Sequence, residues 1–216
     1  MSDFRRDFIR FAIARKAVSF GEFKTKAGRL SPYFFNSGLF NDGESLNQLA
    51  QFYAKAILAS GVAFDMLFGP AYKGIPLVAA VAVALAQAGH NRPFSFNRKE
   101  AKDHGERGNI IGAALAGRVL IVDDAISAGT AVRESYDIIR ADHATPCGVI
   151  VALDRMERGI GALSAVQEVE QSYNVPVISI ATLDDLVSYL QSDPRFTRDL
   201  EAVDKYRQQY GVRAHA

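Results

Sequence analysis

Cysteine is almost absent from this chain, because only Cys147 occurs among 216 residues. A single cysteine cannot form a disulfide within the chain, so a reducing cytoplasm is the expected location. Histidine is also scarce, and His90, His104, His143 and His215 lie far apart without the spacing of metal ligands. The sequence therefore argues against a structural zinc site.

Strong charge of one sign and long apolar runs are lacking as well. Lysine and arginine total 25 against 24 acidic residues, so a net charge of +1 gives no overall reason to expect nucleic acid or an anionic membrane as a partner. Residues 1–17 carry charges where a signal peptide would need an apolar core. The most apolar run, Ile75 to Ala88, is too short for a membrane span and is expected to be a buried helix. We therefore expect a soluble protein.

The length and the order of apolar segments predict one α/β domain over residues 1–216. A chain with 49% hydrophobic residues can bury one sizeable core. Strand-like runs alternate with segments of helical periodicity, which is typical of a mainly parallel sheet flanked by helices. These runs are 65–68, 93–98, 119–122, 148–153 and 177–180. The helical segments after residue 162 are expected to be scaffold and surface.

The most informative stretch is 119–133, which reads VLIVDDAISAGTAVR. Its first four residues are apolar without alternation, as in a central strand that is covered on both faces. The small residues within 125–129 let backbone N–H groups approach an anion, and Ser127 and Thr130 add hydroxyl donors. Helical spacing resumes at Ala131, so the loop leads into a helix N-terminus, which favours phosphate.

Two acids, Asp123 and Asp124, stand between this strand and the loop. Adjacent strand residues point to opposite faces, so the two make a poor acid and base pair, but their carboxylates can accept hydrogen bonds from vicinal sugar hydroxyls. A ribose 5-phosphate would use the acids and the loop together. Two other interpretations are that the acids cap the next helix, or that one binds a metal in a Walker B strand. The second lacks a G-x-x-x-x-G-K-[ST] partner.

Two segments before this stretch add cations and aromatic rings. Residues 20–40 are expected to form a hairpin that presents Lys24, Lys26 and Arg29 beside aromatic side chains, which could contact a flat ligand or simply belong to the core. Residues 68–76, FGPAYKGIP, form a second turn from strand to helix at the ligand-facing edge of the sheet. The amides and the lysine of this turn could hold pyrophosphate, although an ordinary β-turn has the same composition.

Two further segments carry charge. Residues 100–112, EAKDHGERGNIIG, are rich in charge and glycine and are expected to form a mobile loop, which could close over an anionic substrate or could simply be solvated. Arg155 follows the strand at 148–153, where its guanidinium could clamp a carboxylate or a base edge. The ordinary alternative is a surface ion pair of Arg155 with Asp154 or Glu157.

The stretch at 119–133 resembles the phosphoribosyl pyrophosphate signature of type I phosphoribosyltransferases. The segments FKTKAGRLSPYFFNSGLF, MLFGPAYKGIP, FNRKEAKDHGE and ALDRMERG are similar to the orotate-using members of that family, and the match runs essentially end to end. The resemblance implies the type I phosphoribosyltransferase fold, an α/β fold with a central mainly parallel sheet. It also implies a small N-terminal hood, mainly residues 1–40 with C-terminal contributions, and a mobile lid at about 99–112.

The resemblance also implies roles for individual residues. Contacts to phosphoribosyl pyrophosphate would come from Lys26, Tyr72, Lys73, Arg98, Lys99, Lys102, His104, Asp123, Asp124, Ala125, Ile126, Ser127, Ala128, Gly129, Thr130 and Ala131. Contacts to orotate would come from Phe34, Phe35, Ser127 and Arg155. Lys102, Asp123 and Asp124 would act in catalysis, with Lys102 stabilising the charge that develops on pyrophosphate.

The implied reaction is the Mg²⁺-dependent transfer of the phosphoribosyl group to N1 of orotate, which gives orotidine 5′-monophosphate and pyrophosphate in pyrimidine synthesis. Mg²⁺ would be bound mainly through the substrate, so no side chain is assigned to it. The implied assembly is a homodimer in which each lid covers the neighbouring site, with neither nucleic acid nor a membrane as a partner. Two alternatives remain: a type I phosphoribosyltransferase for another base, and a non-catalytic regulator that senses phosphoribosyl pyrophosphate.

Overall fold

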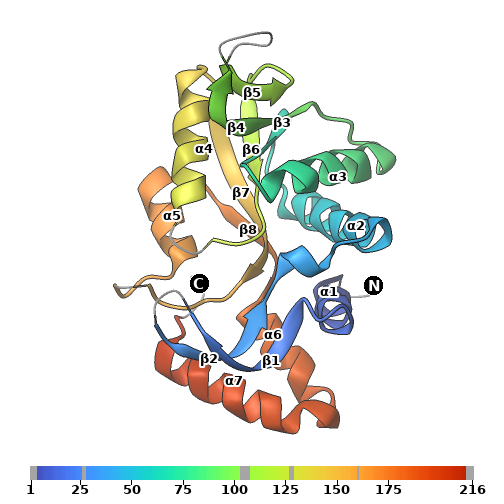
Figure 1. Ribbon diagram of the computed structural model, residues 1–216, viewed down its shortest axis with the longest axis vertical. Coiled ribbons are helices and arrows are strands. Elements are labelled where there is room, and N and C mark those ends of the chain that lie inside the picture. The colour runs from blue at the N-terminus through green and yellow to red at the C-terminus, as the bar shows by residue number, and fades with distance from the viewer. Residues whose placement is uncertain (1–3, 26–27, 103–107, 127–128, 160, 213–216) are drawn as a thin grey trace.

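The computed structural model describes residues 4–25, 28–102, 108–126, 129–159 and 161–212, and for residues 100–102 and 108 it describes the backbone alone. The described strands form a six-stranded sheet of order β5-β4-β3-β6-β7-β8 (Figure 1). Their bounds are β3 Met66–Gly69, β4 Phe94–Lys102, β5 Gly108–Gly112, β6 Arg118–Val122, β7 Thr145–Asp154 and β8 Val177–Thr182. Neighbouring strands are parallel except β4 and β5. The mainly parallel sheet is confirmed.

Side chains of the central strands alternate between two apolar cores. In β6, Leu120 and Val122 belong to the core that α2 and α3 cover, whereas Val119 and Ile121 belong to the core that α4 and α5 cover. Figure 1 shows these two pairs of helices on opposite sides of the sheet. The helices are α1 Phe4–Ala14, α2 Gly43–Ser60, α3 Gly74–Gln87, α4 Thr130–Ala141, α5 Ala165–Tyr173, α6 Leu183–Gln191 and α7 Thr197–Tyr210, with 3-10 turns η1 Ser37–Leu39 and η2 Pro194–Phe196.

An antiparallel hairpin of β1, Val18–Lys24, and β2, Leu30–Phe35, lies apart from the sheet. Ser19 pairs with Phe34 and Lys24 pairs with Leu30, so the turn falls where the sequence predicted it. The strand β2 packs against α7, and Figure 1 shows the hairpin beside that helix. The first and last parts of the chain therefore form one layer below the sheet.

One expectation about the middle of the chain is wrong and another is confirmed. The segment 100–112 is not wholly a loop, because β4 continues to Lys102 and pairs with β5, where Asn97 lies opposite Ile110. The β-branched side chains of 110–111 favour the strand β5, which forms the edge of the sheet. The helix expected at 75–88 is confirmed as α3, which buries one face that includes Leu77, Val81 and Leu85, while Val83 is 56% exposed. Among the helices that the structure describes, none combines the length and apolar composition needed to cross a bilayer.

The direction of chain growth reverses between β3 and β6. After β3 the chain continues to β4 on one side, and after β6 it continues to β7 on the other, although β3 and β6 are neighbours. In open α/β sheets such a switch point, at the carboxyl ends of the strands, is where ligands bind. The loops after β3 and β6 are therefore the first place to look for a site.

Candidate functional site

The loops after β3 and β6 meet at the switch point. The first loop turns tightly, because a Cβ at Gly69 would lie only 2.3 Å from the backbone oxygen of Gly74. In that loop Lys73 places its Nζ 2.7 Å from Oδ2 of Asp124 in the second loop. Ser37, from the η1 turn after the hairpin, donates to the same oxygen at 2.5 Å. Three separate segments therefore converge on Asp124.

The neighbouring acid, Asp123, is buried, with 7% of its surface exposed. Its backbone N–H donates to the carbonyl of Ile150 at 3.0 Å, and its backbone oxygen accepts from the hydroxyl of Tyr53 at 2.8 Å. Its Oδ1 accepts from the N–H of Asp124 at 2.8 Å. Burial, and then the charge of Asp124, raise the pKa of Asp123 to about 7. The two acids therefore differ, since Asp124 faces a cation and Asp123 is partly protonated near neutral pH.

A cavity of about 260 Å³ extends from Asp123 to the start of α4. Its lining includes Ala71, Lys99, Asp123, Ala125, Ile126, Gly129, Thr130 and Ala131. The helix begins at Thr130 after Gly129, which occupies the N-cap position with a φ of 68° and offers no side-chain cap. The interpretation of Asp123 and Asp124 as caps of this helix is therefore wrong. The unpaired N–H groups of a helix N-terminus favour an anion in this cavity.

A second cavity, of about 330 Å³, lies between the hairpin and the carboxyl end of β7. Phe23, Phe34 and Phe35 line it from the hairpin, and residues 153–159 line it from the other side. Phe34 is 44% exposed and stacks on Phe23 with ring centroids 5.5 Å apart, so its ring could contact a planar ligand. Ala125 and Ile126 line both cavities. The two cavities therefore adjoin at the loop after β6.

Arg155 lines the second cavity and pairs with Glu157 at 2.5 Å. The sequence left open an ordinary surface pair with this partner, but the side chains of Arg155 and Glu157 are only 24% and 14% exposed. Burial opposes the charge of Arg155, whereas Tyr33 and Glu157 favour it, and the pKa of the guanidinium is raised. The group is a fixed cation at the aromatic end of the site.

The remaining predicted residues fall into two groups. Tyr72 is 69% exposed beside the first cavity, and the Nζ of Lys99 lies 5.5 Å from the centroid of its ring. Arg98 is half-buried in β4. Lys26, His104, Ser127 and Ala128 lie outside the described residues, as does the side chain of Lys102.

Several residues of the site were missed by sequence reasoning. Ser37, from the segment expected to be a hairpin, and Tyr53, on α2, contact the paired acids without having been named as site residues. Tyr206, on α7, donates to Glu157 at 3.1 Å, so the expectation that the C-terminal helices are only scaffold and surface is wrong. Nothing in the local pattern around these residues distinguishes them from core positions.

The site has few of the ligands that a metal would need from the protein alone. Within the described ranges, no three His, Cys, Asp or Glu side chains are grouped closely enough to hold a metal ion. The two carboxylates at the switch point are hard oxygen donors, which suit Mg²⁺ only when a substrate completes the coordination. The donor set therefore fits a metal that arrives with an anionic ligand.

Comparisons with known proteins agree with this geometry. Residues 39–169 match the model of the phosphoribosyl transferase domain family. The orotate phosphoribosyltransferase of Thiobacillus denitrificans is 65% identical over 98% of this chain and 100% of its own length, and that of Nitrosospira multiformis is 66% identical over 99% and 93%. The crystal structure of orotate phosphoribosyltransferase from Francisella tularensis superposes with a TM-score of 0.87 at 40% identity, covering 95% of this chain and 100% of that one.

Proposed function

This chain belongs to the orotate phosphoribosyltransferase family, and on that premise we propose that it transfers the phosphoribosyl group of phosphoribosyl pyrophosphate to N1 of orotate. The products are orotidine 5′-monophosphate and pyrophosphate, in pyrimidine biosynthesis. The observation that carries the proposal is the junction of the two cavities. One offers a helix N-terminus and paired acids for a sugar phosphate, and the other offers aromatic rings and a guanidinium for an anionic planar base.

The donor would lie along the switch point. Asp123 and Asp124 would accept hydrogen bonds from the ribose hydroxyls, and residues 125–131 would hold the 5′-phosphate at the start of α4. The present contact between Lys73 and Asp124 supports this arrangement, because it places an ammonium group beside the acid that follows Asp123, which lines the cavity.

The pyrophosphate would be held by cations around the first cavity. The loop after β3 carries Tyr72 and Lys73, and the neighbouring strand β4 carries Arg98 and Lys99. Lys26, Lys102 and His104 stay assigned to the same ligand on the strength of the resemblance. Mg²⁺ would join them mainly through the substrate, and when bound it would neutralise charge on the leaving group.

Orotate would occupy the second cavity. The rings of Phe34 and Phe35 would flank the base, Ser127 would hydrogen-bond to it, and Arg155 would face its carboxylate. The bond from C1′ to pyrophosphate breaks as the bond from C1′ to N1 forms, and N1 loses its proton. Because the base is itself the nucleophile, the chain has only to orient the reactants and to stabilise the departing charge, for which Lys102 is the proposed residue.

Assembly and location are also proposals. We propose one catalytic domain over residues 1–216 with a lid at about 99–112, acting in a homodimer in which each lid covers the neighbouring site. The strand pairing of β4 and β5 supports part of this, because it places Lys102 opposite Gly108, both within the predicted lid segment. A cytoplasmic location is supported by the single cysteine, which can form no disulfide within the chain.

The test is turnover followed by ultraviolet absorbance, with phosphoribosyl pyrophosphate, Mg²⁺ and orotate, run beside uracil, adenine, hypoxanthine and nicotinate. We expect turnover of orotate alone and its collapse in Lys102→Ala. Turnover of another base would keep the donor site but overturn the assignment of Phe34, Phe35 and Arg155. Tight binding of the donor without turnover of any base would indicate the regulatory alternative.

A further inference from the structure

The guanidinium of Arg155 is held along one edge by a single carboxylate oxygen. Both Nε and Nη2 donate to Oε1 of Glu157, at 2.9 and 2.5 Å. Nη2 also donates to Oγ of Ser31 on the hairpin at 2.9 Å. The plane of the group is fixed as well, because its central carbon lies 4.2 Å from the ring centroid of Tyr33.

These contacts leave one nitrogen of Arg155 for a ligand. Nη1 donates no hydrogen bond to any residue that the structure describes, whereas Nε and Nη2 are both occupied. The side chain is 24% exposed and lines the cavity of about 330 Å³. Arg155 therefore borders the space where the base would lie, and its Nη1 group carries donors that a carboxylate could accept.

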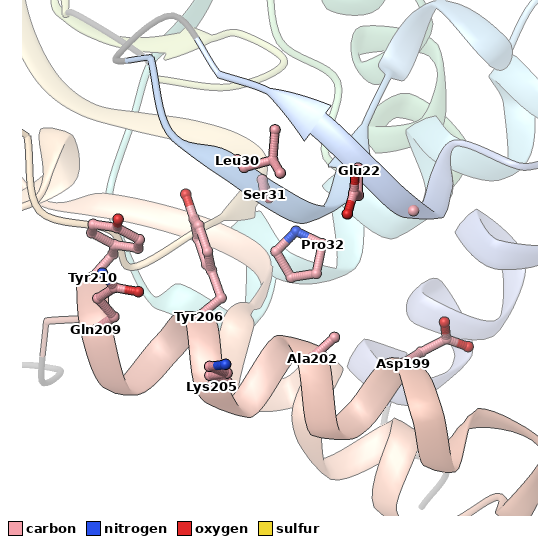
Figure 2. A pocket seen from close by; sticks show the side chains of 11 residues that line it. Glu22, Leu30, Ser31, Pro32, Asp199, Ala202, Lys205, Tyr206, Gln209 and Tyr210 are labelled. Atoms are coloured by element: carbon pink, nitrogen blue, oxygen red, sulfur yellow. The ribbon is translucent and has the colours of Figure 1, made fainter.

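The orienting carboxylate is itself fixed by the C-terminal helix. Oε2 of Glu157 accepts from the hydroxyl of Tyr206 at 3.1 Å. Tyr206 is 5% exposed, and Figure 2 shows it rising from α7 toward the strand that carries Ser31 and Pro32. Burial, and then the charge of Glu157, raise the pKa of Tyr206 against the opposing charge of Arg155, so the hydroxyl keeps its proton and remains a donor. Each oxygen of Glu157 therefore has a separate partner.

We propose that Glu157 and Tyr206 are positioning residues, which hold Arg155 so that its Nη1 edge meets the carboxylate of the substrate. The inference rests on the proposed function and extends it to two residues that touch no substrate. An arginine whose long side chain is already ordered loses less conformational entropy on binding, and its planar group accepts a carboxylate only in the right orientation. The residues that would select a carboxylated pyrimidine therefore come from the segment after β7, the hairpin and α7.

The effect should appear in the KM for orotate. Glu157→Gln keeps the shape of the side chain but weakens its hold on the guanidinium, and we expect the KM for orotate to rise by about tenfold or more. Tyr206→Phe removes one hydrogen bond and should raise it about threefold. The KM for phosphoribosyl pyrophosphate should stay within about twofold in both variants, since the donor binds at the other cavity.

Two matched control variants are available. Glu22→Gln and Tyr210→Phe remove a carboxylate and a hydroxyl that form no hydrogen bond with Arg155 or Glu157 in the part of the chain that the structure describes, from residues that line a neighbouring cavity of about 560 Å³ between the hairpin and α7 (Figure 2). Neither control should change the KM for orotate. Thermal unfolding of all variants shows which are folded, and if Glu157→Gln is not, Tyr206→Phe decides the question.

A double-mutant cycle with Arg155→Met separates positioning from general support. If Glu157 acts through Arg155, Glu157→Gln should raise the KM for orotate in the natural background and add nothing in the Arg155→Met background. Full additivity, or an equal rise in the KM for phosphoribosyl pyrophosphate, would show a merely structural role and overturn the inference. Absence of orotate turnover in the unmodified protein would instead reject the proposed function, and this inference with it.

Discussion

Replacing Asp123 by asparagine should stabilise the free protein at high pH and not at low pH. The asparagine side chain would keep the oxygen that accepts from the N–H of Asp124, and it resembles the protonated acid in shape and charge. The natural carboxyl has its pKa raised from 3.8 to about 7, first by burial and then by Asp124. The folded state therefore holds a proton, between about pH 4 and pH 7, that the unfolded state releases.

The sign and size of the effect follow from this difference. The favourable contribution of the protonated acid is complete below about pH 4 and is lost as pH rises to about 7, at about 1.4 kcal/mol for each pH unit. Over the part of the titration that falls between pH 5 and pH 8, the natural protein should lose about 3 kcal/mol of its free energy of unfolding. The asparagine variant has no such loss, so its advantage in free energy of unfolding should grow by about 3 kcal/mol over that range.

Urea unfolding of both proteins at pH 5, 6, 7 and 8 measures this directly. The protein concentration is held constant, because any assembly would also contribute to the free energy of unfolding. Taking the difference between the two proteins cancels the titration of groups that do not interact with Asp123. Two stability profiles that stay parallel across the range would refute a raised pKa at Asp123 and the electrostatic description of the switch point that depends on it.

Two further predictions concern the loop after β3. Gly69→Ala should lower the melting temperature sharply or prevent folding. The added Cβ would lie 2.3 Å from the Gly74 oxygen and 2.6 Å from a methyl group of Val78. A melting temperature close to that of the natural protein would contradict this prediction. Lys73→Met should raise the KM for phosphoribosyl pyrophosphate at least about tenfold and leave the KM for orotate nearly unchanged, since the ammonium group faces Asp124 on the donor side. Steady-state kinetics with each substrate varied in turn decides the second, and equal changes in both KM values would contradict it.

Much of the fold could be predicted because its strongest signals are local. The apolar run at 119–122 gave a strand buried on both faces, and the loop after it falls at the switch point where the sequence placed it. Gly61 ends α2 with a φ of 69°, the left-handed conformation that glycine commonly adopts at the end of a helix. The failure at 100–112 has a local cause too, since charge and glycine outweighed the two β-branched residues that extend the sheet.

The finer structure of the site could not be predicted, because its contacts join segments that are distant in sequence. Ser37 reaches Asp124 across 87 positions, and Tyr206 reaches Glu157 across 49. Each of these partners is a common residue type in an unremarkable pattern. Only the docking of the hairpin and α7 against the sheet determines which hydroxyl meets which carboxylate.

The burial of Asp123 beside Asp124 can be explained by binding of the donor. Asp123 would be a poor choice for stability alone, because above pH 7 its charge lies buried beside a second carboxylate. Two hydroxyl donors from a ribose, together with a divalent cation on the pyrophosphate, would supply the hydrogen bonds and the positive charge that this arrangement lacks. The free protein therefore holds an electrostatic cost at the position where the donor would relieve it, and donor binding should favour the ionised form. The charge of Asp123 therefore lowers the stability of the free protein but favours binding of the donor. Asp123→Asn should raise the stability and lower the affinity for the donor.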